Sequence, residues 1–182
     1  MRKKSVICVI LAFFLFVCGC GDNYVPRWLI QSDESIADMQ MVSLLDAIES
    51  QDRDALLSLF APSALDNAEN IQRSIELLYS YYQGNHVSYN NWGATGTSTE
   101  RNDNRIVKKL YGTYDVVTDK DTYRFAFLYV AADSANSENV GFQSVYVIRM
   151  EDDVSTQYAY RGDQTYAPGI HIGIQNKLPD EV

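Results

Sequence analysis

The sequence predicts an α+β fold in which N-terminal helices pack on an antiparallel β-sheet. Between residues 32 and 83, apolar side chains recur at the three- and four-residue spacing of one helix face. From residue 87 onward, β-branched and aromatic side chains gather in runs separated by Gly, Asn, Asp and Ser. A series of helices followed by a series of strands is typical of α+β domains.

Two helices are expected before residue 61. Ser32 or Asp33 suits the N-cap of a first helix that runs to about Gln51. Its apolar face comprises Met41, Leu44, Leu45 and Ile48. A second, short helix is expected over residues 53–60. Pro62 should end or bend it, because proline lacks the backbone N–H that a helix interior requires.

A third helix is expected over residues 67–83, where the apolar stripe is clearest. The stripe comprises Ile71, Ile75, Leu78 and Tyr82. Gly84 follows the helix, as glycine often does at a helix end. The same spacing predicts that Tyr82 lies in the core and that Tyr81 lies at its rim.

A series of strands is expected in the second half of the chain. Its members are residues 87–92, 105–118, 122–132 and 140–150, with short edge pieces at 158–160 and 170–172. Residues 91–104, rich in Gly, Thr, Ser and Asn, are expected to be partly loop. Residues 119–121 should form a tight turn and residues 133–139 a polar loop.

Two of these strands, 122–132 and 140–150, are apolar on both faces. An antiparallel sheet normally exposes one face to water, so a second cover is expected over these strands. The sequence leaves three candidates open for that cover. They are the C-terminal tail, a second copy of the chain in a homodimer, and a ligand.

The N-terminus has the layout of a secretory signal. Residues 2–4 are basic, residues 6–17 form an apolar run, and small residues close it. An apolar run of about twelve residues is shorter than the roughly twenty that span a membrane as a helix. Val17-Cys18-Gly19-Cys20 resembles a bacterial lipobox, in which a small or apolar triplet precedes the cysteine that receives lipid. An uncleaved membrane anchor is the alternative.

The lipobox resemblance implies a domain organisation and a location. Residues 1–19 would be a lipoprotein signal peptide, and Cys20 would carry fatty acyl chains such as palmitate. Residues 20–35 would be a tether, and residues 36–182 a single domain. Both the lipidated and the uncleaved alternative place this domain at the cell membrane, on its extracytoplasmic side. Two or more acyl chains give stable anchoring, so the first expected partner is the membrane, through lipid at Cys20.

Charge and ligand spacing exclude several functional classes. Cleavage would remove three of the 15 basic residues and leave 12, against 24 acidic residues. Nucleic-acid binding needs clustered Lys and Arg, so no nucleic-acid partner is expected. No metal site and no cofactor are expected either, because the two histidines and Cys8 lie far from the Cys18–Cys20 pair. The acidic run at 151–153 lacks the alternating spacing of a calcium loop and is expected to be a solvated strand end.

Several short motifs follow one another between residues 39 and 172. They comprise Leu59-Phe60, Ala64-Leu65, Gln83-Gly84, Ser88-Tyr89, Trp92, Tyr114-Asp115-Val116, Thr118-Asp119-Lys120, Tyr123-Arg124-Phe125, Asn139-Val140-Gly141, Ser144, Gly162-Asp163 and Pro168-Gly169-Ile170. In order and spacing they resemble the bacterial lipoproteins that carry the domain of unknown function 5104. That family is placed within the nuclear-transport-factor-2-like (SnoaL-like, cystatin-like) superfamily. The resemblance implies a cone with helices on a curved antiparallel sheet, and it implies no activity. It also places the Arg161-Gly162-Asp163 tripeptide in a turn.

Aromatic and histidine side chains near the junction of helices and sheet form the candidate ligand-binding site. Its members are Tyr82, His86, Trp92 and Tyr114. Aromatic rings with polar tips suit a small-ligand pocket. No residue is assigned as catalytic. Asp115 is expected to point outward or to pair with Arg124, and His86 is expected to be a turn residue satisfied by backbone.

Three functions stay open. The first is a non-enzymatic domain that binds a small ligand or an envelope protein. The second, implied by the superfamily, is a SnoaL-like enzyme that uses an interior Asp or Tyr. The third is a structural dimerisation module. A closed interior filled by side chains would argue against an interior pocket and against the enzyme.

Overall fold

The computed structural model describes residues 31–92, 96–102, 105–153 and 166–173. Contacts divide the chain into residues 1–30 and residues 31–182, and all described residues belong to the second unit. The predicted signal peptide with Cys20, the edge piece at 158–160 and the turn at 161–163 lie outside the described residues.

Four α-helices of the described chain precede the sheet. They are α3 (Asp33–Glu49), α4 (Arg53–Ser58), α5 (Pro62–Asn67) and α6 (Ile71–Tyr81). The predicted N-cap of α3 is confirmed, because Oγ of Ser32 accepts a hydrogen bond from the backbone N–H of Ser35 at 3.1 Å. Helix α4 is capped in the same way by Asp52, whose carboxylate accepts from the N–H of Ala55 at 2.9 Å.

Helix α4 ends at Ser58, before Pro62, and Pro62 opens a further helix that the sequence did not predict. It stands in the first turn of α5, where a missing N–H removes no helical hydrogen bond and the fixed φ suits the helix. The predicted third helix starts later than residue 67. Asn70 has a left-handed backbone conformation with φ 47°, which separates α5 from α6. Helix α5 therefore occupies residues that the sequence left mostly outside any helix, and the predicted third helix is present as Ile71–Tyr81.

Six strands form one sheet. They are β1 (His86–Asn91), β2 (Gly96–Asn102), β3 (Arg105–Thr118), β4 (Thr122–Asp133), β5 (Gly141–Arg149) and β6 (Gly169–Ile172). The order across the sheet is β1-β3-β4-β5-β6, and β2 pairs with β3 alongside this path. The predicted bounds of β3 are confirmed, and so is the tight turn after it, in which the N–H of Thr118 donates to the carbonyl of Asp121 at 2.8 Å.

The sheet departs from the prediction in two strands. Residues 96–102, expected to be partly loop, form β2, which pairs antiparallel with β3 from Gly96 opposite Tyr111 to Asn102 opposite Arg105. Strand β2 consists mostly of exposed polar residues, so it lacks the alternation that marks a half-buried strand. Strand β6 runs parallel to β5, so the sheet is mixed rather than wholly antiparallel.

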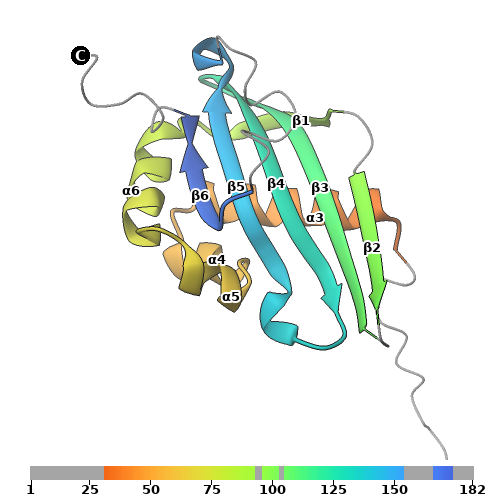
Figure 1. The fold of residues 1–182 in the computed structure, drawn as a ribbon. Helices are drawn as coiled ribbons and strands as arrows, with labels where there is room; N and C mark the ends of the chain where they lie inside the picture. Colours follow the sequence, from red (N-terminus) through yellow and green to blue (C-terminus); the bar gives the residue numbers. More distant parts are fainter. Residues whose placement is uncertain (1–30, 93–95, 103–104, 154–165, 174–182) are drawn as a thin grey trace, which may run out of the picture. The chain divides into compact units, whose positions relative to one another are not determined.

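The described sheet is curved and does not close on itself, and α3 crosses behind its strands (Figure 1). Register shifts interrupt the pairs β1–β3, β3–β4 and β4–β5. Such irregularities bend strands and increase their twist. Helices α4, α5 and α6 lie beside β5 and β6, where Gly141 passes so close to the chain that an added Cβ would be 2.5 Å from the backbone nitrogen of Ala61.

The hydrophobic core fills the space between the helices and the inner face of the sheet. Its sheet side comprises Tyr114, Val116, Tyr123, Phe125, Phe127, Phe142, Val145, Val147, Ile170 and Ile172. The core position of Tyr82 is confirmed. Tyr81, expected at the rim, is also buried. Its hydroxyl donates to Asp152 at 2.8 Å and accepts from the N–H of Arg149 at 2.7 Å, so the polar tip has partners inside the protein.

The outer face of the sheet carries a second, smaller apolar cluster of Ala126, Tyr146 and Ile148. Tyr166, from the segment before β6, packs on this cluster. The N–H of Ala167 donates to the hydroxyl of Tyr146 at 3.1 Å. Residues 166–168 of the C-terminal segment therefore supply part of the cover that the doubly apolar strands require.

Candidate functional site

The four residues predicted to bind a ligand lie in three polar clusters rather than around one cavity. We name the clusters after the charged residue at the centre of each. They are the Glu49 cluster with Tyr82 and His86, the Asp38 cluster with Tyr114, and the Arg124 cluster with Trp92.

The Glu49 cluster joins the ends of α3 and α6 to the start of β1. Oε1 of Glu49 accepts hydrogen bonds from the hydroxyl of Tyr82 at 2.9 Å and from the backbone N–H of His86 at 2.6 Å. Nδ1 of His86 lies 2.9 and 3.0 Å from the two carboxylate oxygens. A carboxylate only accepts, so Nδ1 carries the hydrogen. The prediction that backbone satisfies His86 is therefore wrong, since its partner is a side chain.

The hydrogen bonds of this cluster hold α3, the end of α6 and the start of β1 together. Burial, reinforced by the carboxylate of Glu49, raises the pKa of Tyr82, which therefore stays a protonated donor at neutral pH. The carboxylate already accepts from several donors and has little capacity left to act as a base. Sequence reasoning missed Glu49, although it continues the α3 stripe of Met41 and Leu45 at four-residue spacing.

The Asp38 cluster lies in the N-terminal half of α3. The hydroxyl of Tyr114 donates to Oδ1 of Asp38 at 2.7 Å and accepts from Nδ2 of Asn91 at 3.1 Å. The ring of Tyr114 is fully buried and stacks on Phe127, with 5.8 Å between ring centroids. Tyr114 therefore belongs to the core, and its polar tip is already hydrogen-bonded.

The Arg124 cluster lies on the outer face of the sheet. Nε and Nη2 of Arg124 donate to the two carboxylate oxygens of Asp115 at 2.7 and 3.1 Å, which confirms the predicted pairing. The guanidinium carbon lies 4.7 Å from the ring centroid of Trp92, within the range of a cation–π contact. A charge-assisted fork and an aromatic plane thus hold the guanidinium in one orientation.

Asp153 completes this cluster and corrects the prediction for the acidic run. Its carboxylate lies 3.5 Å from Nη1 of Arg124, and its side chain is 3 % exposed. Asp152, its neighbour, accepts the hydroxyl hydrogen bond of Tyr81. Only Glu151 behaves as the solvated residue that was expected, at 67 % side-chain exposure. The run is therefore part of the structure and not merely a charged strand end.

Within the described part of the chain, large aromatic side chains pack the space between the helices and the sheet. Five large aromatic side chains are completely buried between the helices and the sheet: Tyr114, Tyr123, Phe125, Phe127 and Phe142. Several of these rings touch one another at centroid distances of 5.2 to 5.8 Å, as closely packed aromatic side chains do. A ligand that entered this space would have to displace core side chains.

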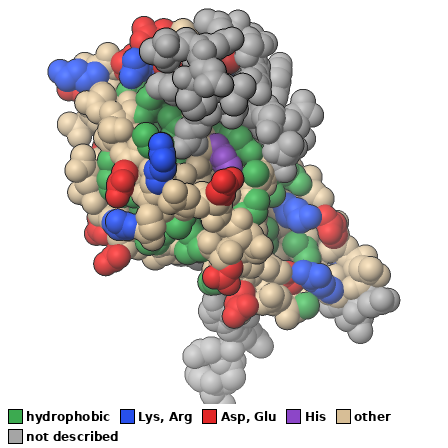
Figure 2. Space-filling model, turned by 60° about the vertical axis from the view of Figure 1, so that its left-hand side comes forward, with side chains coloured by type: hydrophobic (Ala, Val, Ile, Leu, Met, Phe, Trp, Pro, Cys, Tyr) green, Lys and Arg blue, Asp and Glu red, His purple; other side chains and the backbone are tan. Residues whose placement is uncertain are grey.

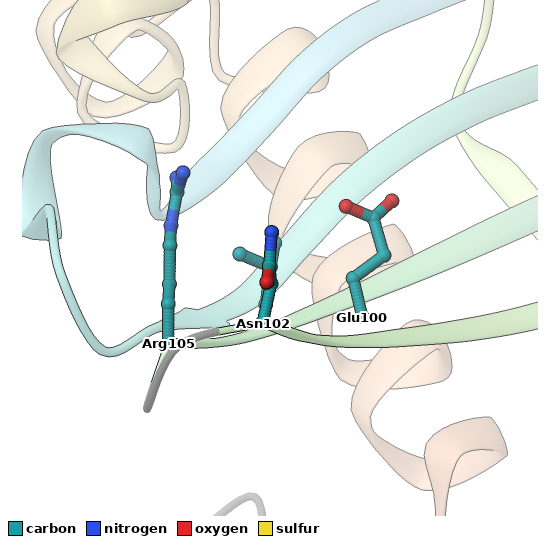
Figure 3. Close-up of a pocket in the computed structure, with 4 residues that line it drawn as sticks. Glu100, Asn102 and Arg105 are labelled. Atoms are coloured by element: carbon teal, nitrogen blue, oxygen red, sulfur yellow. The ribbon is translucent and has the colours of Figure 1, made fainter.

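A shallow groove lies on the outer face of the sheet, where β2 ends and β3 begins. Its volume is about 380 Å³, and its walls include Val107, Leu128 and Val130. Glu100, Asn102 and Arg105 rise from the β2–β3 hairpin toward the same side of the sheet (Figure 3). The charges of the groove are paired: Lys109 with Glu100 at 2.6 Å, and Arg105 with Asp133 at 2.5 Å.

Exposed apolar side chains lie near the other end of β3 and in the adjacent strand β1. Trp92 is 38 % exposed and Val117 is 41 % exposed, and Val87 in the neighbouring edge strand is 70 % exposed.

In the described ranges, no three His, Cys, Asp or Glu side chains are grouped so that they could hold a metal ion. None of the helices within those ranges is long and apolar enough to cross a membrane.

Comparison with known proteins adds a family but no activity. The family model described as "Domain of unknown function (DUF5104)" matches residues 43–150, which run from α3 through the end of β5. No curated protein matches the chain.

Proposed function

The chain belongs to the family of the Domain of unknown function (DUF5104), and from that premise we propose that it is an extracytoplasmic lipoprotein domain that binds a protein partner on the outer face of its sheet. In this proposal it is not an enzyme, and it takes no ligand between helices and sheet. Its partner is another protein of the cell envelope.

The filled interior carries the proposal. Space for a substrate between helices and sheet is taken by completely buried aromatic rings. Two acidic groups that are candidates for an acid or base have structural partners: Asp115 is held by Arg124, and Glu49 by Tyr82 and His86. General acid–base catalysis needs a titrating group within reach of a substrate, and these groups reach neighbouring side chains instead.

The exposed rim of the Arg124 cluster supports a binding role. Trp92 and Val117 present apolar surface at the end of the sheet where charged residues are tied into pairs. Trp and Arg are the residue types that dominate binding energy at protein interfaces. A half-exposed Trp92, fixed by a buried guanidinium, is already ordered before a partner arrives. Less conformational entropy is then lost on binding.

The proposed location rests on the sequence. The lipobox at residues 17–20 would place acyl chains on Cys20, only 13 residues before the first described helix, which begins at Asp33. The domain would therefore stay close to the membrane surface. We also place the domain in the nuclear-transport-factor-2-like superfamily, which is supported by helices followed by a curved sheet.

Site-specific photo-crosslinking in cells tests the binding surface. A photoreactive amino acid is placed at position 92 or 117 of the full-length lipoprotein, with Asp54 on exposed α4 as the matched control position. We expect one shared cross-linked protein at positions 92 and 117 and none at position 54. An identical pattern at all three positions, or no product at 92 and 117, would contradict the proposal.

An enzyme remains the second candidate because of one observation. Asp38 faces the interior Tyr114 at 2.7 Å, which is the kind of pair that the enzyme hypothesis requires. The completely buried ring of Tyr114 argues against it, since a reacting group must be reached by substrate. The role of Tyr82, His86, Trp92 and Tyr114 as ligand contacts stays a prediction. Of these four residues, we assign only Trp92 to the proposed binding surface.

A further inference from the structure

Strand β1 is an edge of the sheet that is open on its outer side. It pairs with β3 on one side, and no strand of the described residues pairs with its other side. Residues 87–90 are all exposed, with Val87 at 70 % and Tyr89 at 37 %. An edge strand presents backbone donors and acceptors to any strand that comes beside it. The outer side of β1 is therefore accessible to a further strand.

The other described edges of the sheet are protected. Helix α6 lies beside β6 (Figure 1), and a Cβ added to Gly169 of β6 would lie 2.9 Å from Cβ of Ala68. Figure 2 turns this side forward and shows charged and other polar side chains lying over it among apolar ones. Strand β2 carries Glu100 and Arg101, and charged side chains on an edge discourage pairing. Strand β1 contains no Lys, Arg, Asp, Glu or Pro.

The alternation of hydrogen bonds shows which backbone groups of β1 face outward. The N–H of Trp92 donates to the carbonyl of Thr113 on β3 at 2.7 Å, so these two residues form a bonded pair. In an antiparallel ladder, bonded and non-bonded pairs alternate. The register is regular from Ser88 to Asn91, which places Tyr89 in a non-bonded pair. The N–H and the carbonyl of Tyr89 therefore point away from β3, toward the open side.

A second copy of the chain complements this edge. When two antiparallel β1 strands meet with Tyr89 opposite its counterpart, the two residues exchange both backbone hydrogen bonds, and Ser88 lies opposite Asn90. The register shift between His86 and Ser88 then falls at the ends of the paired segment. The two Tyr89 rings lie on the same face of the joined strands, and aromatic cross-strand pairs stabilise a sheet.

Charge also favours a second copy at this edge. The chain carries 24 acidic residues against 15 basic ones, so two copies repel each other over much of their surface. Because β1 has no acidic or basic residue apart from His86, two β1 strands bring no like charges opposite each other in this register. A two-fold contact uses the same edge in both copies, so assembly ends at the dimer and no open β1 edge remains.

We propose that two copies of the chain form a dimer by antiparallel pairing of their β1 strands across a two-fold axis at Tyr89. The sheet of one copy continues into the sheet of the other. This contact uses the edge of the sheet, whereas the proposed partner surface lies on its outer face, so neither proposal requires the other.

Sedimentation equilibrium of the full-length chain in density-matched detergent tests the dimer. We expect a monomer–dimer equilibrium for the native protein. Tyr89→Pro removes the outward N–H without removing a hydrogen bond to β3, and an edge strand tolerates proline at such a position. Tyr89→Lys keeps the N–H but places two like charges on the axis. Each change acts twice in a two-fold contact, so each should weaken dimerisation about tenfold or more.

Two matched variants should dimerise like the native protein. Tyr89→Phe keeps the ring and the backbone N–H, and Thr99→Lys adds the same charge at an exposed position of β2. Thermal unfolding identifies any variant that fails to fold, and Tyr89→Lys provides the test if Tyr89→Pro does so. The proposal is overturned if the native protein stays monomeric at the highest concentration measured. It is equally overturned if folded Tyr89→Lys dimerises as strongly as Thr99→Lys.

Photo-crosslinking in cells distinguishes a second copy from another occupant of the edge. With a photoreactive amino acid at position 90, we expect a product of twice the mass of the chain that contains no other protein. A product formed only with a different protein would assign the edge to that protein and overturn the dimer. Because sedimentation uses the purified chain alone, a monomeric result would leave the proposed outer-face function untouched.

Discussion

Tyr114 donates a hydrogen bond to Asp38 at 2.7 Å and thereby ties the centre of the sheet to helix α3. Eleven residues further along the same helix, Glu49 accepts a hydrogen bond from Tyr82 at 2.9 Å. Between these two carboxylates runs the apolar stripe of α3, which includes Met41 and Leu45. Two tyrosines, Tyr114 and Tyr82, therefore fix the helix on its packing surface, and both were also predicted as ligand contacts.

Tyr114→Phe should destabilise the domain by roughly 1.5–3 kcal/mol, because the variant loses a hydrogen bond to a carboxylate and leaves Asp38 without that donor. Urea unfolding followed by tryptophan fluorescence measures the change. Tyr79→Phe is the control, since the Tyr79 hydroxyl is buried and has no hydrogen-bond partner among the described residues. That control should be neutral or slightly stabilising. If the two variants were equally stable, the Asp38 contact would not stabilise the fold.

Asp133→Asn should change how stability depends on pH. Hydrogen bonds from Arg105, then Asn139, and from the N–H groups of Ala135 and Asn136 hold the pKa of Asp133 well below its ordinary value of 3.8. A carboxyl with a lowered folded pKa stabilises the native state fully above its unfolded pKa, and this contribution is lost as the pH falls below that value. The variant should therefore be less stable than the native protein at pH 7.

The difference in unfolding free energy between the two proteins should shrink as the pH falls from about 4 toward about 2. Urea midpoints measured across that interval provide the check. Asp54→Asn, at an exposed position of α4, is the matched control for the loss of one negative charge. A constant difference for Asp133→Asn would show that its donors do not favour the ionised carboxylate.

The fold was predictable where local pattern and tertiary structure agree. Strand β3 matches its predicted bounds because it alternates buried and less buried residues along its second half. Strand β2 was missed because its side chains are polar and mostly exposed, so its existence depends on pairing with β3. Helix α5 was missed because the proline that breaks a helix interior also suits the first turn of a new helix.

The polar clusters were less predictable than the strands. Sequence spacing places Glu49 on the packing face of α3, but it does not say that His86, 37 residues away, will lie against it. The pairing of Asp115 with Arg124 was predictable from the sequence, because a tight turn fixes the register of β3 against β4. The contact of Asp153 with the same guanidinium was not, since it depends on the path of the chain after β5.

Gly112→Ala should destabilise the domain by about 1–3 kcal/mol through overpacking. Gly112 lies directly opposite Phe127 in the β3–β4 pair, and an added Cβ would meet three atoms of that ring at 2.3 to 2.9 Å. Because the ring is buried, it cannot swing away into water. Thermal and urea unfolding measure the loss.

A double mutant isolates this contact. Phe127→Leu leaves a smaller side chain opposite position 112, so Gly112→Ala should be less harmful in that background than alone. The coupling free energy between the two substitutions should be favourable by about 1 kcal/mol or more, as for residues in direct contact. Strict additivity would show that the strand absorbs the methyl group by moving elsewhere.

Cys20→Ala should abolish lipid attachment, whereas Cys18→Ala should be nearly silent. Cys20 stands at the position of the lipobox that receives lipid, and Cys18 lies within the segment that cleavage would remove. Metabolic labelling with a radioactive fatty acid, followed by separation of membrane and soluble fractions, measures both effects. The two variants remove the same thiol two residues apart, so each controls for the other. Labelling of Cys20→Ala at the native level would place the acyl chains elsewhere, while equal loss in both variants would point to a general failure of export rather than to a modified cysteine.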